Sequence, residues 1–233
     1  MKTSKTLKYI FISFLLVQAV AVAWGQEKKP ETAEWFPAQG FTLGVNLAGP
    51  VSSLLNSERK GFSFLTRISL MDKWNLYGEA GFENVNFDKP EYSYTSNGSF
   101  FKVGVERNML KKSESGFIDQ LLLGGSYGFS FQNHGASQFR VVNNYWNDYS
   151  GSFDSYLMSS HWIEISAGPR AELFKNFFMG WSLHIKAFLF RSNREIMTPY
   201  LMPGYGNGDN KINASFSYNI EYMIPWKKAK VVK

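Results

Sequence analysis

The sequence FTLGVNL at residues 41–47 alternates apolar side chains with small or polar ones, and ASFSYNIE at residues 214–221 repeats the pattern. A period of two indicates a β-strand with one apolar and one polar face, because successive side chains point to opposite sides. Eight stretches of this kind follow one another along the chain. Eight such strands behind a secretory leader are typical of a transmembrane β-barrel, whose apolar face meets lipid and whose polar face lines the lumen.

The first 25 residues have the features of a signal peptide. Three lysines precede an apolar run over residues 9–22, and small residues follow at Ala21, Ala23 and Gly25. This arrangement is the usual one for a leader that is removed after export. Cleavage after Ala23 or Gly25 fits the pattern, and we favour Gly25.

Composition excludes several classes of protein. The chain has no cysteine, which excludes a disulfide scaffold, thiol catalysis and cysteine-based metal sites. After the leader, no run reaches the ~18 apolar residues that a membrane-spanning helix needs. Aromatic residues make up 17% of the chain, an excess that the aromatic girdles of a membrane barrel explain. An aromatic-rich soluble β-sandwich is the alternative.

The net charge of +6 gives no indication of a nucleic-acid partner. Three of the lysines lie in the leader and four in the last seven residues, so the body of the chain is near −1. The basic end is most simply a solvated tail that touches lipid head groups or periplasmic polymers.

Short and long connections alternate along the chain. Short links are expected at residues 72–74, 111–116 and 175–176, and long ones at residues 52–61, 89–98, 134–160 and 192–212. Outer-membrane barrels have short periplasmic turns and long external loops, and an even strand count puts both termini in the periplasm. The expected strands are 41–51, 62–71, 75–87, 99–110, 117–133, 161–174, 177–191 and 213–224.

The sequence therefore predicts an all-β fold, an eight-stranded antiparallel up-and-down transmembrane β-barrel. It divides into the signal peptide 1–25, a flexible periplasmic lead-in 26–40, the barrel 41–226 and a basic C-terminal tail 227–233. The expected location is the bacterial outer membrane, where lipid surrounds the barrel.

Charged residues within the strands fall almost entirely on one parity. On the lipid side each would cost ~2–4 kcal/mol at the bilayer centre, so this parity must be the lumen. Eight strands leave an interior that side chains fill, and a salt-bridged plug is the simplest arrangement; a proton or ion relay is the alternative. The predicted lumen network consists of Arg67, Glu79, Glu83, Lys102, Glu106, Glu164, Arg170, Glu172, His184, Lys186 and Glu221.

Catalysis has one weak candidate. Ser159 and His161 share a face at the junction of a long loop and a strand, with Glu164 further along the strand. A nucleophilic hydroxyl needs a base within hydrogen-bond reach and a third group that orients the base. The pair would suit a lipid-modifying hydrolase at the rim of the barrel. The spacing of histidines and carboxylates predicts no metal site, and no cofactor is expected.

The long loops contain many aromatic residues. Disordered loops are poor in such residues, and tyrosine, tryptophan and methionine are enriched at interfaces. Either the loops fold over the barrel mouth and pack on each other, or they form a docking surface. The partner-binding candidates are Tyr145, Trp146, Tyr149, Phe153, Tyr156, Tyr200, Met202 and Tyr205.

Several segments in order carry a resemblance to a known family. They are GVNL at residues 44–47, SFFKVGV at 99–105, GSYGFS at 125–130, HW at 161–162 and YMIP at 222–225. Over roughly residues 40–226 the chain resembles an outer-membrane β-barrel family of Bacteroidota that is described as a domain of unknown function. The resemblance implies an outer-membrane barrel and supplies no catalytic residues. Many outer-membrane barrels end on an aromatic residue, whereas seven residues follow Trp226 here.

These observations predict a non-enzymatic barrel that acts as a structural or interaction subunit for other envelope proteins or lipoproteins. The first alternative is the rim hydrolase that uses Ser159 and His161. The second is a narrow channel, which would need a wider lumen than eight strands usually leave.

Overall fold

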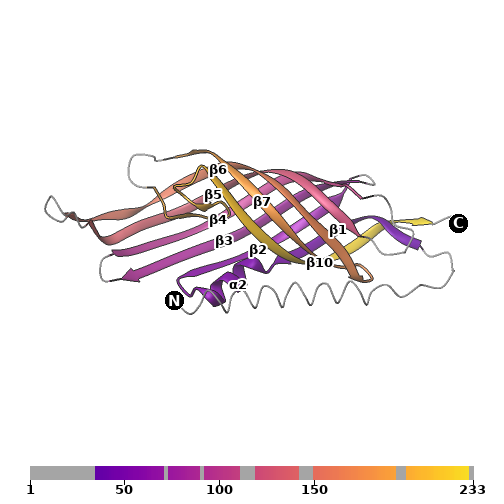
Figure 1. Ribbon diagram of the computed structural model, residues 1–233, viewed down its shortest axis with the longest axis horizontal. Coiled ribbons are helices and arrows are strands. Elements are labelled where there is room, and N and C mark those ends of the chain that lie inside the picture. Colours follow the sequence, from indigo (N-terminus) through magenta and orange to yellow (C-terminus); the bar gives the residue numbers. More distant parts are fainter. Residues whose placement is uncertain are drawn as a thin grey trace.

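A computed structural model of the protein describes residues 35–70, 73–89, 92–110, 119–141, 149–192 and 198–230. Eight long strands form a closed antiparallel barrel with the order β1-β10-β7-β6-β5-β4-β3-β2 (Figure 1). The predicted eight-stranded up-and-down transmembrane barrel is confirmed. The strands are β1 (Trp35–Asn46), β2 (Arg59–Ser69), β3 (Trp74–Lys89), β4 (Tyr92–Asn108), β5 (Gln120–Val141), β6 (Tyr149–Phe174), β7 (Phe177–Arg191) and β10 (Ile212–Lys230).

Three short elements lie between the long strands. Helix α2 (Ala48–Leu55) follows β1, and the strands β8 (Leu201–Met202) and β9 (Gly206–Asn207) form a small hairpin between β7 and β10. Among the residues that the structure describes, no helix has the length and apolar character needed to cross a membrane.

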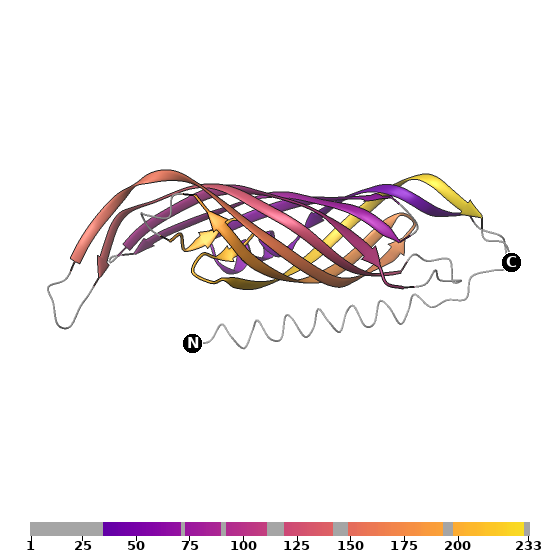
Figure 2. The same ribbon diagram turned by 90° about the horizontal axis from the view of Figure 1, so that it is seen from above.

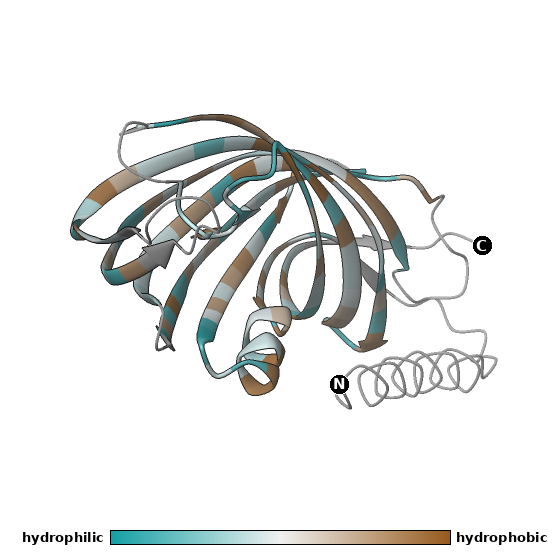
Figure 3. Ribbon diagram, turned by 60° about the vertical axis from the view of Figure 1, so that its left-hand side comes forward, coloured by the Kyte–Doolittle hydropathy of each residue, from teal (hydrophilic) through white to brown (hydrophobic). Residues whose placement is uncertain are grey.

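The period-two pattern sorts side chains between the outside and the inside of the barrel. Phe64, Ile165 and Ile185 face outward and are 61%, 64% and 60% exposed. Their strand neighbours Leu65 and Glu164 face inward and are each 2% exposed. Figure 3 shows the resulting alternation of hydrophobic and hydrophilic residues along the strands. The outer wall is therefore an apolar band suited to lipid, and the inside is polar.

The barrel extends further at its termini than the predicted boundaries. β1 begins at Trp35, inside the predicted lead-in 26–40, and β10 reaches Lys230, inside the predicted tail 227–233. The two segments pair with each other from Trp35 opposite Lys230 to Asn46 opposite Asn219. Hydrogen bonds between the two segments pair backbone N–H and C=O groups that would otherwise need water as a partner. This pairing explains why β1 and β10 are longer than predicted. The signal peptide and the rest of the lead-in and tail lie outside the described residues.

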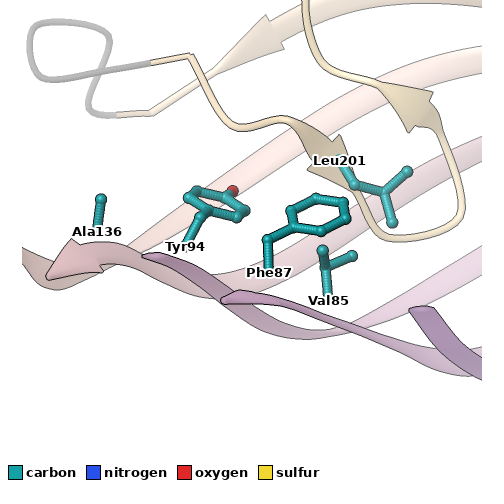
Figure 4. Close-up of a cluster of buried hydrophobic side chains, with 5 residues drawn as sticks. All are labelled: Val85, Phe87, Tyr94, Ala136 and Leu201. Carbon is teal, nitrogen blue, oxygen red and sulfur yellow. The ribbon is translucent and has the colours of Figure 1, made fainter. Parts of the chain in front are cut away.

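Two of the predicted long loops are mostly strand. β3 and β4 continue until Lys89 lies opposite Tyr92, and β5 and β6 pair as far as Val141 opposite Tyr149. The extra length packs an apolar cluster inside the barrel mouth (Figure 4). The extension is stable because these side chains are buried at 7% exposure or less; the cluster consists of Val85, Phe87, Tyr94, Ala136 and Leu201.

The predicted continuation of the first strand to residue 51 is wrong, because α2 begins at Ala48. Asn46 ends the strand: its Oδ1 accepts a hydrogen bond from the Ala48 N–H at 3.0 Å. Pro50 cannot donate to a β-ladder, but a proline is tolerated in the first turn of a helix. The chain therefore turns into a helix where the alternating pattern alone favours a strand.

Candidate functional site

The barrel interior near the short connections contains a layer of four charged residues. Arg67 donates from Nε to Glu106 Oε2 at 2.5 Å and from Nη1 to Glu221. Arg170 donates from Nε to the other Glu221 oxygen at 2.7 Å and from Nη1 to Gln120 at 2.7 Å. Four different strands supply these side chains, so the layer ties opposite walls of the barrel together.

A second layer lies around Lys102. The Nζ atom of Lys102 is 3.0 Å from Glu79 Oε2 and 3.3 Å from Glu164 Oε2. Glu79 also accepts hydrogen bonds of 2.7 Å from the hydroxyls of Ser63 and Tyr77. Charge and hydrogen bonds together compensate for the removal of these groups from water, which a buried ion pair requires.

His184 extends the second layer toward β10. Its Nδ1 atom is 2.7 Å from Glu164 Oε1, and its Nε2 atom is 2.8 Å from Ser217 Oγ. Both ring nitrogens therefore have a fixed partner, which holds the ring in one orientation.

The structure places nine of the eleven predicted lumen residues in the buried interior. Glu83 is the first of the two others and pairs with Arg59 at 3.3 Å near the mouth, where the two side chains are 17% and 38% exposed. Glu172 is the second and accepts a hydrogen bond of 2.8 Å from the Asn176 N–H at the opposite end. The buried residues are Arg67, Glu79, Lys102, Glu106, Glu164, Arg170, His184, Lys186 and Glu221.

Above the charged layers, the β8–β9 hairpin folds into the mouth of the barrel. Its Gly204 carbonyl accepts a hydrogen bond of 2.7 Å from Lys186 Nζ, and its Leu201 carbonyl accepts one of 3.2 Å from Gln132. Gly204 has a φ of 73°, and a Cβ at this position would press against the ring of Phe100. Glycine is thus needed for both the turn and the close approach.

Met202 and Tyr205 are not on a docking surface, contrary to the sequence prediction. Both are fully buried and form a cluster with Phe100 and Trp162 under the hairpin. The side chains point inward because the hairpin that carries them closes the barrel mouth. For this loop, packing over the mouth was the better of the two expectations.

The remaining partner-binding candidates lie in different environments. Phe153 and Tyr156 are half-buried against the His134 ring, at centroid distances of 5.8 Å and 4.5 Å. Tyr200 is 57% exposed and stands at an edge of the Phe87 ring. Tyr145, Trp146 and the Tyr149 side chain lie outside the described residues. Of the candidates described, Tyr200 is the side chain most available to a partner.

The proposed hydrolase residues do not assemble into a catalytic group. Ser159 Oγ lies 3.3 Å from Ser192 Oγ, whereas His161 Nδ1 lies 2.7 Å from the Tyr127 hydroxyl. The His161 ring faces outward and stacks on Phe190 at 4.3 Å. Glu164 has the opposite parity and is buried in the lumen, so it cannot orient this histidine. The geometry contradicts the Ser159 and His161 site.

Sequence reasoning missed the uncharged partners of the network. They occupy lumen-facing positions of their strands, so the same alternation could have indicated them. An uncharged side chain at such a position, however, has a smaller desolvation cost than a charged one and so indicates a partner less strongly. Among the described residues, no group of three or more histidine, aspartate or glutamate side chains is arranged to hold a metal ion. The missed partners are Thr42, Ser63, Tyr77, Gln120 and Ser217.

The fold and its interior define a small transmembrane β-barrel whose lumen is filled by paired charges. The chain belongs to the family described as Domain of unknown function (DUF6048), whose model matches residues 6–229. This confirms the predicted family resemblance, whereas the Bacteroidota source stays a prediction. No curated protein matches the chain.

Solved structures include similar chains. The crystal structure of Ail, the attachment invasion locus protein of Yersinia pestis, is 9% identical with a TM-score of 0.37 and covers 79% of this chain and 96% of that one. Ail in complex with the heparin analogue sucrose octasulfate is 11% identical with a TM-score of 0.35 and covers 79% and 94%.

Proposed function

We propose that the protein is a non-enzymatic outer-membrane barrel that acts as a structural or interaction subunit for other envelope proteins or lipoproteins. The observation that carries this proposal is the filled interior. Two layers of paired charges and a hydrophobic cluster under the β8–β9 hairpin follow one another along the barrel axis. A barrel blocked three times in series is poorly suited to transport, which supports a function carried by its outer surfaces.

The two ends of the barrel support the expected orientation in the membrane. Trp35 and Lys230 lie opposite each other at the end with the short connections, such as the β6–β7 turn at residues 175–176. Short turns and both termini belong to the periplasmic side in barrels of this type. The leader 1–25 would export the chain, and the long hairpins would face the exterior.

The β5–β6 hairpin is the surface best suited to a partner. β5 has 22 residues and β6 has 26, whereas a tilted strand crosses a bilayer with ~9–11 residues. About 11–13 residues of β5 and about 15–17 of β6 therefore lie beyond the lipid, which corresponds to roughly 35–55 Å of strand counted over both ends. Figure 2 shows this hairpin reaching beyond the other strands.

One edge of this hairpin is open for further strand pairing. β4 covers the β5 side as far as Phe139, but β7 ends opposite Ser160 on the β6 side. Within the described residues, no strand of the barrel pairs with residues 149–155 along that edge. An open strand edge accepts an extended peptide through main-chain hydrogen bonds. An extended segment of an envelope protein or lipoprotein is therefore the expected partner.

The test is purification of the tagged protein from native outer membranes in mild detergent. A variant that replaces residues 138–151 by an Asn-Gly turn removes the tip of the hairpin and keeps the barrel. We expect a stoichiometric companion with the wild type that is lost from this variant. A matched control shortens the β3–β4 tip at residues 88–93 and should retain the companion. Recovery of the wild-type protein alone, as a compact heat-modifiable monomer, would contradict the proposal.

A further inference from the structure

The barrel wall has a gap between the outer parts of β2 and β10. β1 separates these two strands only as far as Asn46, which pairs with Ser63 on one side and Asn219 on the other. β2 begins at Arg59 and β10 at Ile212, so both strands continue beyond the end of β1. Among the described residues, no strand bridges them there.

Helix α2 closes only the β2 side of the gap. A Cβ at Gly49 would lie 2.6 Å from the Gly61 carbonyl oxygen, so the helix touches the β2 backbone directly. Ser53 Oγ accepts a hydrogen bond of 3.1 Å from the Gly61 N–H, replacing the ladder partner that β1 would have supplied. On the β10 side, the Leu47 N–H donates to the Tyr218 carbonyl at 2.7 Å, but within the described residues α2 makes no hydrogen bond to residues 212–217.

A cavity of about 420 Å³ occupies this position. Lumen-facing residues line it, including Lys102 and Lys186, together with outward-facing residues such as Phe62 and Phe216. Because both faces of the wall contribute, the cavity connects the interior with the apolar outer surface at the gap. Its volume lies within the ~300–1,000 Å³ range of small-molecule sites.

The charged side chains that line the cavity are three cations, Arg59, Lys102 and Lys186, and two carboxylates, Glu79 and Glu83. Arg59 is paired with Glu83, and Lys102 is held by Glu79 and Glu164. Lys186 is 5% exposed and donates to the Gly204 carbonyl, but within the described residues no carboxylate forms an ion pair with it. An ammonium group has three donors, so Lys186 retains the capacity to bind an oxyanion in the cavity.

The approach to the gap is apolar. On α2, Val51, Leu54 and Leu55 are 51%, 87% and 58% exposed, and Phe216 of β10 is 39% exposed. The helix that carries the first three of these exposed apolar side chains also lines the cavity through Ala48, Gly49 and Ser52, an arrangement that matches a ligand with one anionic and one apolar end. Lipid at the barrel wall is the natural source of such a ligand.

We propose that this lateral cavity binds the anionic head group of a membrane amphiphile, a phosphate or a carboxylate, through Lys186. The apolar chain of the amphiphile lies outside the wall along α2 and Phe216. The site goes beyond the structural role proposed above and does not depend on it. A soluble phosphate ester has the same head-group chemistry, so the experiment separates the two sources.

The experiment is native mass spectrometry of the full-length protein released from detergent, titrated with dilauroyl phosphatidic acid. We expect one lipid to bind saturably, and dilauroyl phosphatidylcholine and glycerol 3-phosphate to bind more weakly. Loss of a charge-assisted contact in Lys186→Gln should weaken phosphatidic acid binding about tenfold or more. Ser215→Trp should block binding by filling the cavity without a change of charge.

The matched control is Lys60→Gln, which removes an exposed charge on β2 that does not line the cavity, and it should bind like the wild type. Heat modifiability of each variant verifies that the barrel is folded. Equal binding of phosphatidylcholine would overturn the proposal, as would wild-type affinity in both cavity variants. Glycerol 3-phosphate that binds as tightly as phosphatidic acid would show a soluble ligand instead of an amphiphile.

Discussion

Glu221 is the residue on which the lower charge layer depends. It is 1% exposed and its two carboxylate oxygens bind two different arginines, Arg67 and Arg170. The Arg170 guanidinium also lies 3.7 Å from the centroid of the Phe178 ring, an apolar contact that leaves it few other polar partners. Among the described residues Glu221 is the one carboxylate that pairs with Arg170, whereas Arg67 also pairs with Glu106.

Glu221→Gln should accordingly reduce the free energy of unfolding by ~3–5 kcal/mol, because it leaves the buried Arg170 without a carboxylate partner and removes one of the two that bind Arg67. Urea unfolding of the protein refolded into phospholipid vesicles measures the effect. The control is Glu83→Gln, since the partly exposed Arg59 and Glu83 pair is worth less than ~1 kcal/mol. Equal effects of the two substitutions would show that the lower layer does not hold the barrel together.

His134 predicts an acid-sensitive outer end of the barrel. It lies beyond the lipid-facing band that ends near Phe131, and it is fully buried among Phe153, Tyr156 and Tyr94. Burial lowers the pKa of His134 to about 4, and the nearby positive charge of Arg191 acts in the same direction. The folded state therefore disfavours the charged imidazolium.

Between pH 6.5 and pH 4 the unfolded chain binds a proton at this histidine and the folded chain does not. Stability contributed by neutral His134 is thus present above pH 6.5 and is lost as the pH falls toward 4, by up to ~3 kcal/mol. His134→Phe keeps the aromatic packing and should flatten this part of the stability profile. Parallel profiles for the wild type and the variant between these pH values would contradict the assignment.

At the scale of the elements, alternation was sufficient to predict the long strands and their inward faces. Lipid outside and paired charges inside impose opposite chemistry on neighbouring side chains, so Phe64 and Leu65, or Ile163 and Glu164, are separated by parity alone. The charged members of the network could therefore be predicted from the sequence, but the partner of each one could not. The pairing of each carboxylate with its cation depends on how neighbouring strands are aligned around the barrel. The sequence of a single strand does not contain this alignment.

Other elements could not be predicted because their local signals point elsewhere. Asn97-Gly98 is typical of a turn, yet both residues lie inside β4 opposite Asn84 and Glu83. Tertiary packing at the mouth overrides the local preference. Helix α2 was missed for another reason: Val51, Leu54 and Leu55 have helical spacing, but a segment of eight residues is too short to be separated from the end of a strand by pattern alone. Met202 and Tyr205 were predicted to be interface side chains of a loop, but the β8–β9 hairpin places them in the barrel interior.

Two glycines of β5 provide a matched test of how the elements pack. Gly128 faces inward opposite Trp162, and a Cβ there would overlap the fully buried indole ring. Gly128→Ala should cost ~1–3 kcal/mol of unfolding free energy because the core is already filled. Gly125 faces outward with nothing within 4 Å of an added Cβ, so Gly125→Ala should remain within ~0.5 kcal/mol of the wild type. Similar losses for both would show that the cost comes from replacing a glycine within the strand and not from overlap with the Trp162 ring.

For the whole molecule, the decisive property is that the obstructions lie in series. Ions that enter from the mouth meet the cluster of Phe100, Trp162, Met202 and Tyr205, then the Lys102 layer, then the Arg67 layer. We therefore expect no steady conductance when the purified barrel is inserted into planar lipid bilayers. Opening one layer should not change this, because the other two still fill the lumen.

The double substitution Glu79→Ala with Lys102→Ala tests the series arrangement directly. It removes both members of the central ion pair and so leaves fewer unpaired charges than either single substitution would. The variant should stay closed in the same bilayer recordings while losing stability in urea. A steady current through the wild-type barrel would contradict the closed lumen and with it the structural role. A current through the double variant alone would show that the Lys102 layer is the only effective barrier, and that the hydrophobic cluster and the Arg67 layer leave a continuous path.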